Sequence, residues 1–241
     1  MKKLLILLLL ASCAGTNWVA PNDFIYAPID GGDYEFATWQ KINNPSNNHI
    51  HIYIEGDGHS FDAYGRPTNN PTPRGTLVRD LAARDSAENV VYMARACQFI
   101  MNDKCDESDW TDGRFSQKII DNQARAIKKI AGNKKITIIG YSGGAMISGL
   151  IIEQNPELKI EKWITIAGVL NHEQWTKYFN DAPLSRSVNM NKLPAVKQLH
   201  LVGERDDVVP VELSKQWANE SDIKIIPNAK HNDFGDLNLF E

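Results

Sequence analysis

The sequence predicts an α/β fold in which a mostly parallel central sheet is covered by helices on both faces. Short apolar runs rich in β-branched residues alternate along the chain with segments at helical spacing, which is typical of such a sheet. The run 136–139 contains a single polar residue, Thr137, as in a strand that is buried on both faces. The chain has 241 residues, a length that suits one domain with a substantial core.

The expected strands and helices follow one another in the order that a parallel sheet requires. Strands are expected at residues 23–29, 34–39, 49–54, 89–94, 135–139, 163–169, 198–203 and 223–226. Helices are expected at residues 75–84, 116–131, 145–154 and 211–219. Asp30–Asp33 is a hairpin-type turn, so the first two strands are expected to form an antiparallel pair. The segment 171–194 is expected to be a loop that provides only a minimal lid.

Residues 1–12 have the pattern of a secretory signal peptide. The segment has a basic start and an apolar run, Leu4–Leu10, that is too short to span a bilayer. Its end resembles the bacterial lipoprotein signal, in which cleavage precedes a cysteine that becomes acylated. We therefore expect a lipid anchor on Cys13, a tether over residues 13–22 and a single domain over residues 23–241. An ordinary cleaved signal peptide is the alternative.

Ala14, the residue after Cys13, bears on where the protein is located, and the net charge of the chain bears on which partners it binds. Ala14, and not an aspartate, follows Cys13, which by resemblance fits the outer membrane of a bacterial cell envelope. The formal net charge is −4 and no block of lysines and arginines occurs, which argues against a nucleic-acid partner. The sequence does not indicate an oligomeric state.

Cys97 and Cys105 are the two cysteines that remain once Cys13 is assigned to the anchor. They stand close together in a loop-like stretch, and an exported protein lies in an oxidising compartment. We therefore expect a disulfide between them, with two free thiols as the alternative. No histidine or second cysteine pair stands nearby at the spacing of metal ligands, so no metal site and no cofactor is predicted.

The candidate chemistry centres on the segment Gly140-Tyr141-Ser142-Gly143-Gly144, between an expected strand and an expected helix. The outer glycines leave room for a sharp turn in which larger side chains would collide. Such a turn holds the Ser142 hydroxyl above the sheet edge, with the Gly143 N–H beside it at the positive end of the helix. This pattern is the nucleophile elbow of the α/β-hydrolases. A helix cap in another α/β fold is the alternative.

The order of a hydrolase triad along the chain selects its other members. In α/β-hydrolases the serine is followed by the acid and then by the histidine. His231 is the only histidine beyond the late strand 198–203, so it is the expected base. The segment after that strand resembles the Gly-x-x-Asp-x-Val-Val-Pro turn of many α/β-hydrolases, which selects Asp206 as the acid. Asp207 is the rival, since either aspartate could leave the strand end toward the histidine.

An oxyanion hole needs a second N–H besides that of Gly143. The loop after the third main strand, Glu55-Gly56-Asp57-Gly58, stands in the place of the His-Gly loop of esterases, with Glu55 where histidine is usual. We expect the Asp57 N–H to be the donor, with Gly56 as the alternative. The Asp57 carboxylate would oppose a developing oxyanion and is therefore expected to turn away, toward an arginine such as Arg74.

Three further side chains are candidates for the substrate pocket. His172 and Trp175 lie in the segment where many hydrolases insert a lid, and Trp110 lies in the long loop 95–115. A loop histidine and buried packing of the two tryptophans are the alternatives.

The chain resembles bacterial α/β-hydrolase-fold lipoproteins over nearly the whole mature domain. The segments that carry the resemblance are 54–58, 70–74, 96–98 with the second cysteine downstream, 140–144 and 167–172. The resemblance implies the fold and the serine triad and leaves the substrate open.

These residues predict acyl transfer without a cofactor: Ser142 as nucleophile, His231 as base and Asp206 as its support. With only a minimal lid, an open cleft favours a carboxylesterase with a small-molecule or acyl substrate over an interfacial lipase. A peptidase or a thioesterase would use the same triad. The alternative from a different class is a surface-displayed binding lipoprotein that has kept the fold without turnover.

Overall fold

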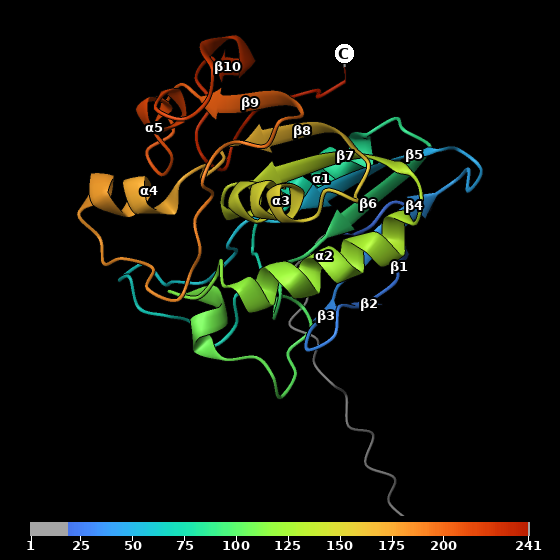
Figure 1. The fold of residues 1–241 in the computed structure, drawn as a ribbon, viewed down its shortest axis with the longest axis horizontal. Helices are drawn as coiled ribbons and strands as arrows, with labels where there is room; N and C mark the ends of the chain where they lie inside the picture. The colour runs from blue at the N-terminus through green and yellow to red at the C-terminus, as the bar shows by residue number, and fades with distance from the viewer. Residues whose placement is uncertain (1–18, 241) are drawn as a thin grey trace, which may run out of the picture.

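An eight-stranded sheet forms the centre of the protein in the computed structural model, which describes residues 19–240 (Figure 1). The strands lie side by side in the order β1-β4-β6-β5-β7-β8-β9-β10. Their bounds are β1 Ile25–Tyr26, β4 Thr38–Ile42, β5 His49–Ile54, β6 Asn89–Met93, β7 Lys135–Tyr141, β8 Ile160–Ile166, β9 Lys197–Gly203 and β10 Ile223–Ile226. The strands from β6 to β10 in this order are parallel, and β4 and β1 continue the sheet as antiparallel neighbours. The prediction of a mostly parallel sheet is confirmed.

Helices cover both faces of the sheet, as predicted. Their bounds are α1 Leu77–Arg84, α2 Gln117–Ala131, α3 Gly143–Gln154, α4 His172–Phe179 and α5 Val211–Lys215, with short 3₁₀ helices η1 Glu107–Trp110 and η2 Glu220–Asp222. α2 and α3 lie on one face, and α1 packs on the other (Figure 1). The alternation in β5 accounts for the two layers: Ile50, Ile52 and Ile54 join the core beneath α2 and α3, and Tyr53 joins the core beneath α1.

The first two predicted strands are each divided. The predicted turn is present, with the Gly31 N–H donating to the Tyr34 carbonyl over 2.8 Å, but it joins the short strands β2 (Ile29–Asp30) and β3 (Glu35–Phe36) of a separate hairpin. β1 and β4 belong to the main sheet. Pro28 separates β1 from β2, and a proline has no N–H for a continuous strand ladder.

Three later elements also differ from prediction. The helix predicted at 211–219 is α5, which ends at Lys215. The strand predicted at 163–169 is β8, three residues earlier, because Ala167 has a φ of 48° and cannot continue an extended strand. The segment 171–194 contains α4, which the sequence analysis missed. Asn171 caps this helix by accepting the Gln174 N–H over 2.9 Å, and the helix ends at the left-handed Asn180.

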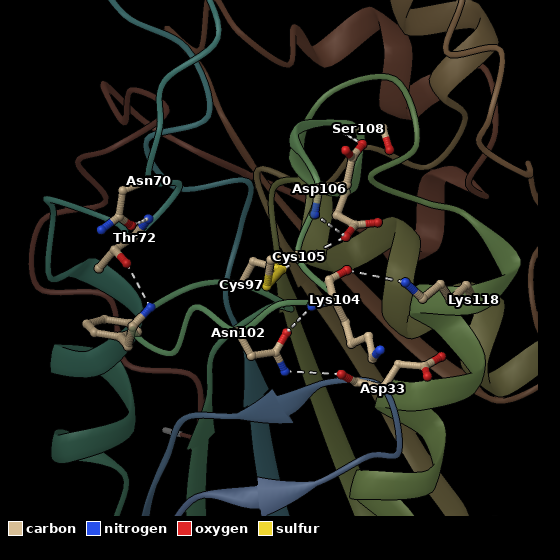
Figure 2. The surroundings of a disulfide bond; sticks show 12 residues. Asp33, Asn70, Thr72, Cys97, Asn102, Lys104, Cys105, Asp106, Ser108 and Lys118 are labelled. Atoms are coloured by element: carbon tan, nitrogen blue, oxygen red, sulfur yellow. Dashed lines mark hydrogen bonds between the residues drawn. A yellow bond between two sulfur atoms is a disulfide. The ribbon is translucent and has the colours of Figure 1, made fainter.

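The predicted disulfide is confirmed. Cys97 and Cys105 are bonded, with their Cα atoms 5.8 Å apart, within the loop between β6 and α2 (Figure 2). Inside the ring that the disulfide closes, the Asn102 amide donates to the Asp33 carbonyl over 3.1 Å. The loop is therefore held both by a covalent bond and by the β2–β3 turn.

The predicted N-terminal features lie mostly outside the described residues. The signal peptide 1–12, Cys13 and the first part of the tether are among them. Within residues 19–240 no helix is both long enough and apolar enough to cross a bilayer.

Candidate active site

Ser142 stands at the sharp turn between β7 and α3, as predicted. Its φ of 50° and ψ of −121° are unusual for a residue with a side chain, and this strain is typical of a nucleophile elbow. The flanking glycines make the turn possible. A Cβ on Gly140 would lie 2.5 Å from the Gly144 carbonyl oxygen, and a Cβ on Gly144 would overlap the backbone oxygen of Glu55.

The structure brings Ser142, His231 and Asp206 together at the carboxyl end of the sheet. Nε2 of His231 lies 3.0 Å from Oγ of Ser142. Nδ1 of His231 lies 2.9 Å from Oδ2 of Asp206 and 3.1 Å from Oδ1. All three side chains are at least nine-tenths buried, so water competes little for these contacts.

The structure separates the two aspartates that the sequence left as rivals. Oδ1 of Asp206 accepts the N–H groups of Val208 and Val209 over 2.9 and 2.8 Å, which fixes the carboxylate beside His231. Asp207 is exposed to solvent. Asp206 is therefore the acid that contacts the histidine.

Tyr141 supports the His231 loop, a role that the sequence analysis missed. Its hydroxyl donates to the Asn232 carboxamide oxygen over 2.6 Å and lies 3.1 Å from the His231 carbonyl oxygen. Its ring centroid is 5.3 Å from that of His231. Burial raises the pKa of Tyr141, so the hydroxyl remains a donor at every physiological pH. The only signal in the sequence is a polar aromatic residue in the variable position before the serine.

The N–H groups near Ser142 distinguish between the two expected oxyanion donors. The Gly56 N–H donates to its neighbour's carboxylate, Glu55 Oε1, over 2.9 Å and is not free for a substrate. Within the described residues, no acceptor receives a hydrogen bond from the N–H of Asp57 or of Gly143. The geometry therefore favours Asp57 over Gly56 as the partner of Gly143.

Glu55 occupies the position where esterases usually have a histidine. Its carboxyl group is buried and also accepts the Tyr92 hydroxyl over 2.8 Å. Burial raises the pKa of Glu55, since the low-dielectric interior penalises the charged form. Glu55 therefore links the backbone N–H of Gly56 to the Tyr92 hydroxyl of β6.

The Asp57 carboxylate pairs with arginines, as predicted, but it lies against Gly143 of the elbow and is not turned away from it, and the arginines are Arg95 and Arg114 and not Arg74. Oδ1 accepts a hydrogen bond from Nη1 of Arg95 over 2.9 Å, and Oδ2 lies 3.2 Å from Nε of Arg114. The carboxylate also explains why residue 143 is a glycine, because a Cβ there would overlap Oδ1 of Asp57. The expectation of Arg74 was wrong because ion pairs between distant segments leave no local pattern in the sequence.

The segment next to the disulfide also holds the loop of Gly56 and Asp57. The Gln98 amide donates to the Gly56 carbonyl over 2.9 Å and accepts the Arg95 N–H over 3.0 Å. Arg95 is fully enclosed, and burial lowers the pKa of its guanidinium while Asp57 opposes that shift. The loop bearing the Asp57 N–H is thus fixed by side chains from the segment 95–98.

A cleft with a volume of about 780 Å³ opens above Ser142 and His231. Of the three predicted pocket residues, Trp175 lines this cleft, together with Phe61 and Val208. The Trp175 indole N–H donates to the Val208 carbonyl over 2.7 Å, which holds the ring at the rim.

His172 and Trp110 do not line the cleft. His172 is buried at the start of α4 and stacks on Phe115, with 5.8 Å between ring centroids, and burial lowers the pKa of its imidazole. Trp110 donates its indole N–H to the Thr68 carbonyl over 2.9 Å. Both are packing residues. Among residues 19–240 no cluster of three or more His, Cys, Asp or Glu side chains is arranged to hold a metal ion.

Solved structures of serine hydrolases share this fold. An α/β serine hydrolase without a lid from Xanthomonas campestris is 16% identical, with a TM-score of 0.53 over 90% of this chain and 89% of that one. A serine hydrolase homologue from Coxiella burnetii is 18% identical, with a TM-score of 0.53 over 89% and 91%. Est1E from Butyrivibrio proteoclasticus is 14% identical, with a TM-score of 0.54 over 86% and 90%. At these identities the likeness establishes the α/β-hydrolase fold.

A family model supplies the assignment that the fold alone does not. No curated protein was found that matches the chain. The family model described as serine hydrolase (FSH1) matches residues 82–231, a stretch that contains the elbow and ends at His231. The match covers more than half of the chain and agrees with the predicted hydrolase class. The chain therefore belongs to the serine hydrolase (FSH1) family.

Proposed function

We propose that the protein is a carboxylesterase that cleaves its substrate through a Ser142–His231–Asp206 triad. The observation that carries the proposal is the 3.0 Å contact between Nε2 of His231 and Oγ of Ser142, with Asp206 on the other ring nitrogen. A serine hydroxyl is a weak nucleophile until an adjacent base can take its proton. This contact supplies that base.

The reaction proceeds in two acyl transfers. His231 takes the Ser142 proton as Oγ attacks the ester carbonyl carbon, and the N–H groups of Gly143 and Asp57 bind the oxyanion. The C–O bond to the alcohol then breaks, and the leaving oxygen takes the proton from His231. Water attacks the acyl-enzyme with His231 again as base, which releases the acid and restores Ser142. Asp206 holds the imidazole tautomer and stabilises the imidazolium in both halves.

The shape of the cleft supports an esterase of small substrates over an interfacial lipase. α4 has only eight residues, and the segment around it provides no long lid to enclose a lipid chain. An open cleft suits a small or protruding acyl group. A peptidase or a thioesterase would use the same triad, so substrate panels must compare all three bond types.

Covalent labelling tests the proposal against the alternative of a binding protein without turnover. A fluorophosphonate probe is expected to label the wild-type protein, and peptide mapping is expected to find the phosphonyl group on Ser142. Short-chain 4-nitrophenyl esters are expected to be hydrolysed faster than matched anilides and thioesters. A wild-type protein that is neither labelled nor active would favour the binding protein.

We also propose that Cys13 is lipid-anchored, with the domain facing the periplasm or the cell surface from the outer membrane. The basis is the lipoprotein-like sequence at residues 1–13, with Ala14 following. Expression in a bacterium with a labelled fatty acid tests this. The label is expected in the membrane fraction of wild type and to be lost in Cys13→Ser. Equal labelling of the two proteins would refute the anchor.

A further inference from the structure

Arg114 is a buried cation at the wall of the catalytic cleft. It follows η1 in the loop before α2, and it lines the same cleft as Ser142 and His231. Its side chain is 6% exposed. Desolvating a guanidinium is costly unless its charge and its donors find partners. The partners of the Arg114 guanidinium therefore indicate whether it has a structural role or is available to a ligand.

The protein leaves the donors of Arg114 largely unused. Its Nε lies 3.2 Å from Oδ2 of Asp57, but no hydrogen bond joins the two atoms. Within residues 19–240, no acceptor receives a hydrogen bond from the Arg114 guanidinium. Arg95 donates to the same carboxylate over 2.9 Å. One carboxylate thus faces two arginines, so Asp57 by itself does not balance both of their charges.

The surroundings of the guanidinium restrict what can reach it. The rings of Phe61, Phe115 and Trp175 lie around it, with centroids 5.7 to 5.8 Å from its central carbon. Aromatic faces stabilise the cation but offer it no hydrogen-bond acceptor. Phe61, Phe115 and Trp175 line the same cleft as Arg114 and Ser142, so the arginine and the apolar rings border the space above the nucleophile.

We propose that Arg114 binds a carboxylate carried by the substrate, so that the enzyme prefers esters with a negative charge near the scissile bond. This inference rests on the proposed esterase function. A planar guanidinium fork matches a carboxylate with two parallel hydrogen bonds, and such charge-assisted bonds are strong where water is excluded. The apolar rings accommodate the short carbon chain that separates the carboxylate from the ester. The substrate class is a monoester of a small dicarboxylic acid, or an ester of an alcohol that bears a carboxylate.

Matched pairs of esters test the preference. The first pair is mono-4-nitrophenyl glutarate, which carries a carboxylate on the acyl side, and 4-nitrophenyl pentanoate, which carries no charge. The second pair is 4-carboxyphenyl pentanoate, which carries a carboxylate on the alcohol side, and phenyl pentanoate, which carries no charge. In Arg114→Met, kcat/KM for the anionic member of at least one pair is expected to fall by about 10- to 100-fold more than for its neutral partner. Arg114→Lys is expected to recover part of the difference.

A matched control separates contact from net charge. Arg186 is 64% exposed, pairs with Asp112 and does not line the cleft. Arg186→Gln removes one positive charge nearby. In each pair, the ratio of kcat/KM for the anionic ester to kcat/KM for the neutral ester is expected to stay unchanged. If Arg114→Met lowers kcat/KM by the same factor for the anionic and the neutral ester of both pairs, Arg114 acts only through Asp57 and the inference is wrong.

A binding measurement keeps this inference separate from the proposed function. Calorimetry on Ser142→Ala is expected to detect glutarate binding that weakens by about 10-fold or more when Arg114→Met is added. If no ester is hydrolysed but glutarate still binds through Arg114, the esterase proposal fails and the anion site stands. If esters are hydrolysed but glutarate does not bind, or inorganic phosphate binds in its place, the carboxylate assignment fails.

Discussion

Replacing His231 by alanine is expected to lower kcat for ester hydrolysis by about 10⁵- to 10⁶-fold, which is the scale of losing the base of a serine triad. Nε2 of His231 is 3.0 Å from the Ser142 hydroxyl, and the structure offers that hydroxyl no other base at hydrogen-bond distance among the described residues. Without the imidazole, Oγ cannot lose its proton as it attacks, and the leaving alkoxide has no acid. The rate of 4-nitrophenyl ester hydrolysis measures the loss.

The same experiment has a built-in control in the double variant. Ser142→Ala alone is expected to lower kcat by as much as His231→Ala does. The double variant is expected to have the same kcat as either single variant, because the two residues act as one unit. Circular dichroism should show that each variant keeps the wild-type fold. A His231→Ala protein with activity within about 10-fold of wild type would exclude this triad, since loss of an essential base costs far more.

Replacing Asp206 by asparagine is expected to lower kcat by about 10⁴-fold with little change in fold. Oδ1 of Asp206 accepts two backbone N–H groups, from Val208 and Val209. An asparagine would keep its oxygen there and turn its NH₂ group toward Nδ1 of His231. Nδ1 would then have to accept, which places the ring proton on Nε2, facing Ser142. In that tautomer the imidazole cannot take the serine proton.

Asp207 provides the matched control for this prediction. It is the next residue along the chain and is exposed. Asp207→Asn makes the same chemical change at nearly the same place and is expected to leave kcat within about 2-fold of wild type, as surface changes usually do. The comparison is a pH–rate profile of wild type and both variants. Equal losses in the two variants would mean that general charge, and not the contact with His231, supports the activity.

The parts of the site set by local pattern could be predicted from the sequence. The glycines at 140 and 144 require a tight turn whatever surrounds them, and chain order then selects His231. The strands β5 and β10 have the predicted bounds, because alternation and flanking polar loops define short strands well. Local rules and chain order therefore sufficed to place Ser142 at the turn and to select His231, which lies beside it.

What could not be predicted depends on contacts between distant segments. Asp57 contacts Arg95 and Arg114, which are separated from it along the chain by α1, β6 and the intervening loops, and no periodicity in the sequence predicts those contacts. α4 was missed because its eight residues carry few buried positions, so its apolar pattern is weak. His172 and Trp110 were candidates by position, and only packing reveals that they face away from the cleft.

The Cys97–Cys105 bond links the compartment in which the chain folds to the order of the loop that contains Gly56 and Asp57. Closing a ring of this size removes conformations from the unfolded chain and is worth about 2.5 kcal/mol of stability on the chain-entropy account. Gln98 lies inside that ring and Arg95 stands two residues before it, and both hold the loop of Gly56 and Asp57. Chains made where glutathione keeps thiols reduced would lack this restraint. In such chains we expect the loop of Gly56 and Asp57 to be held less firmly.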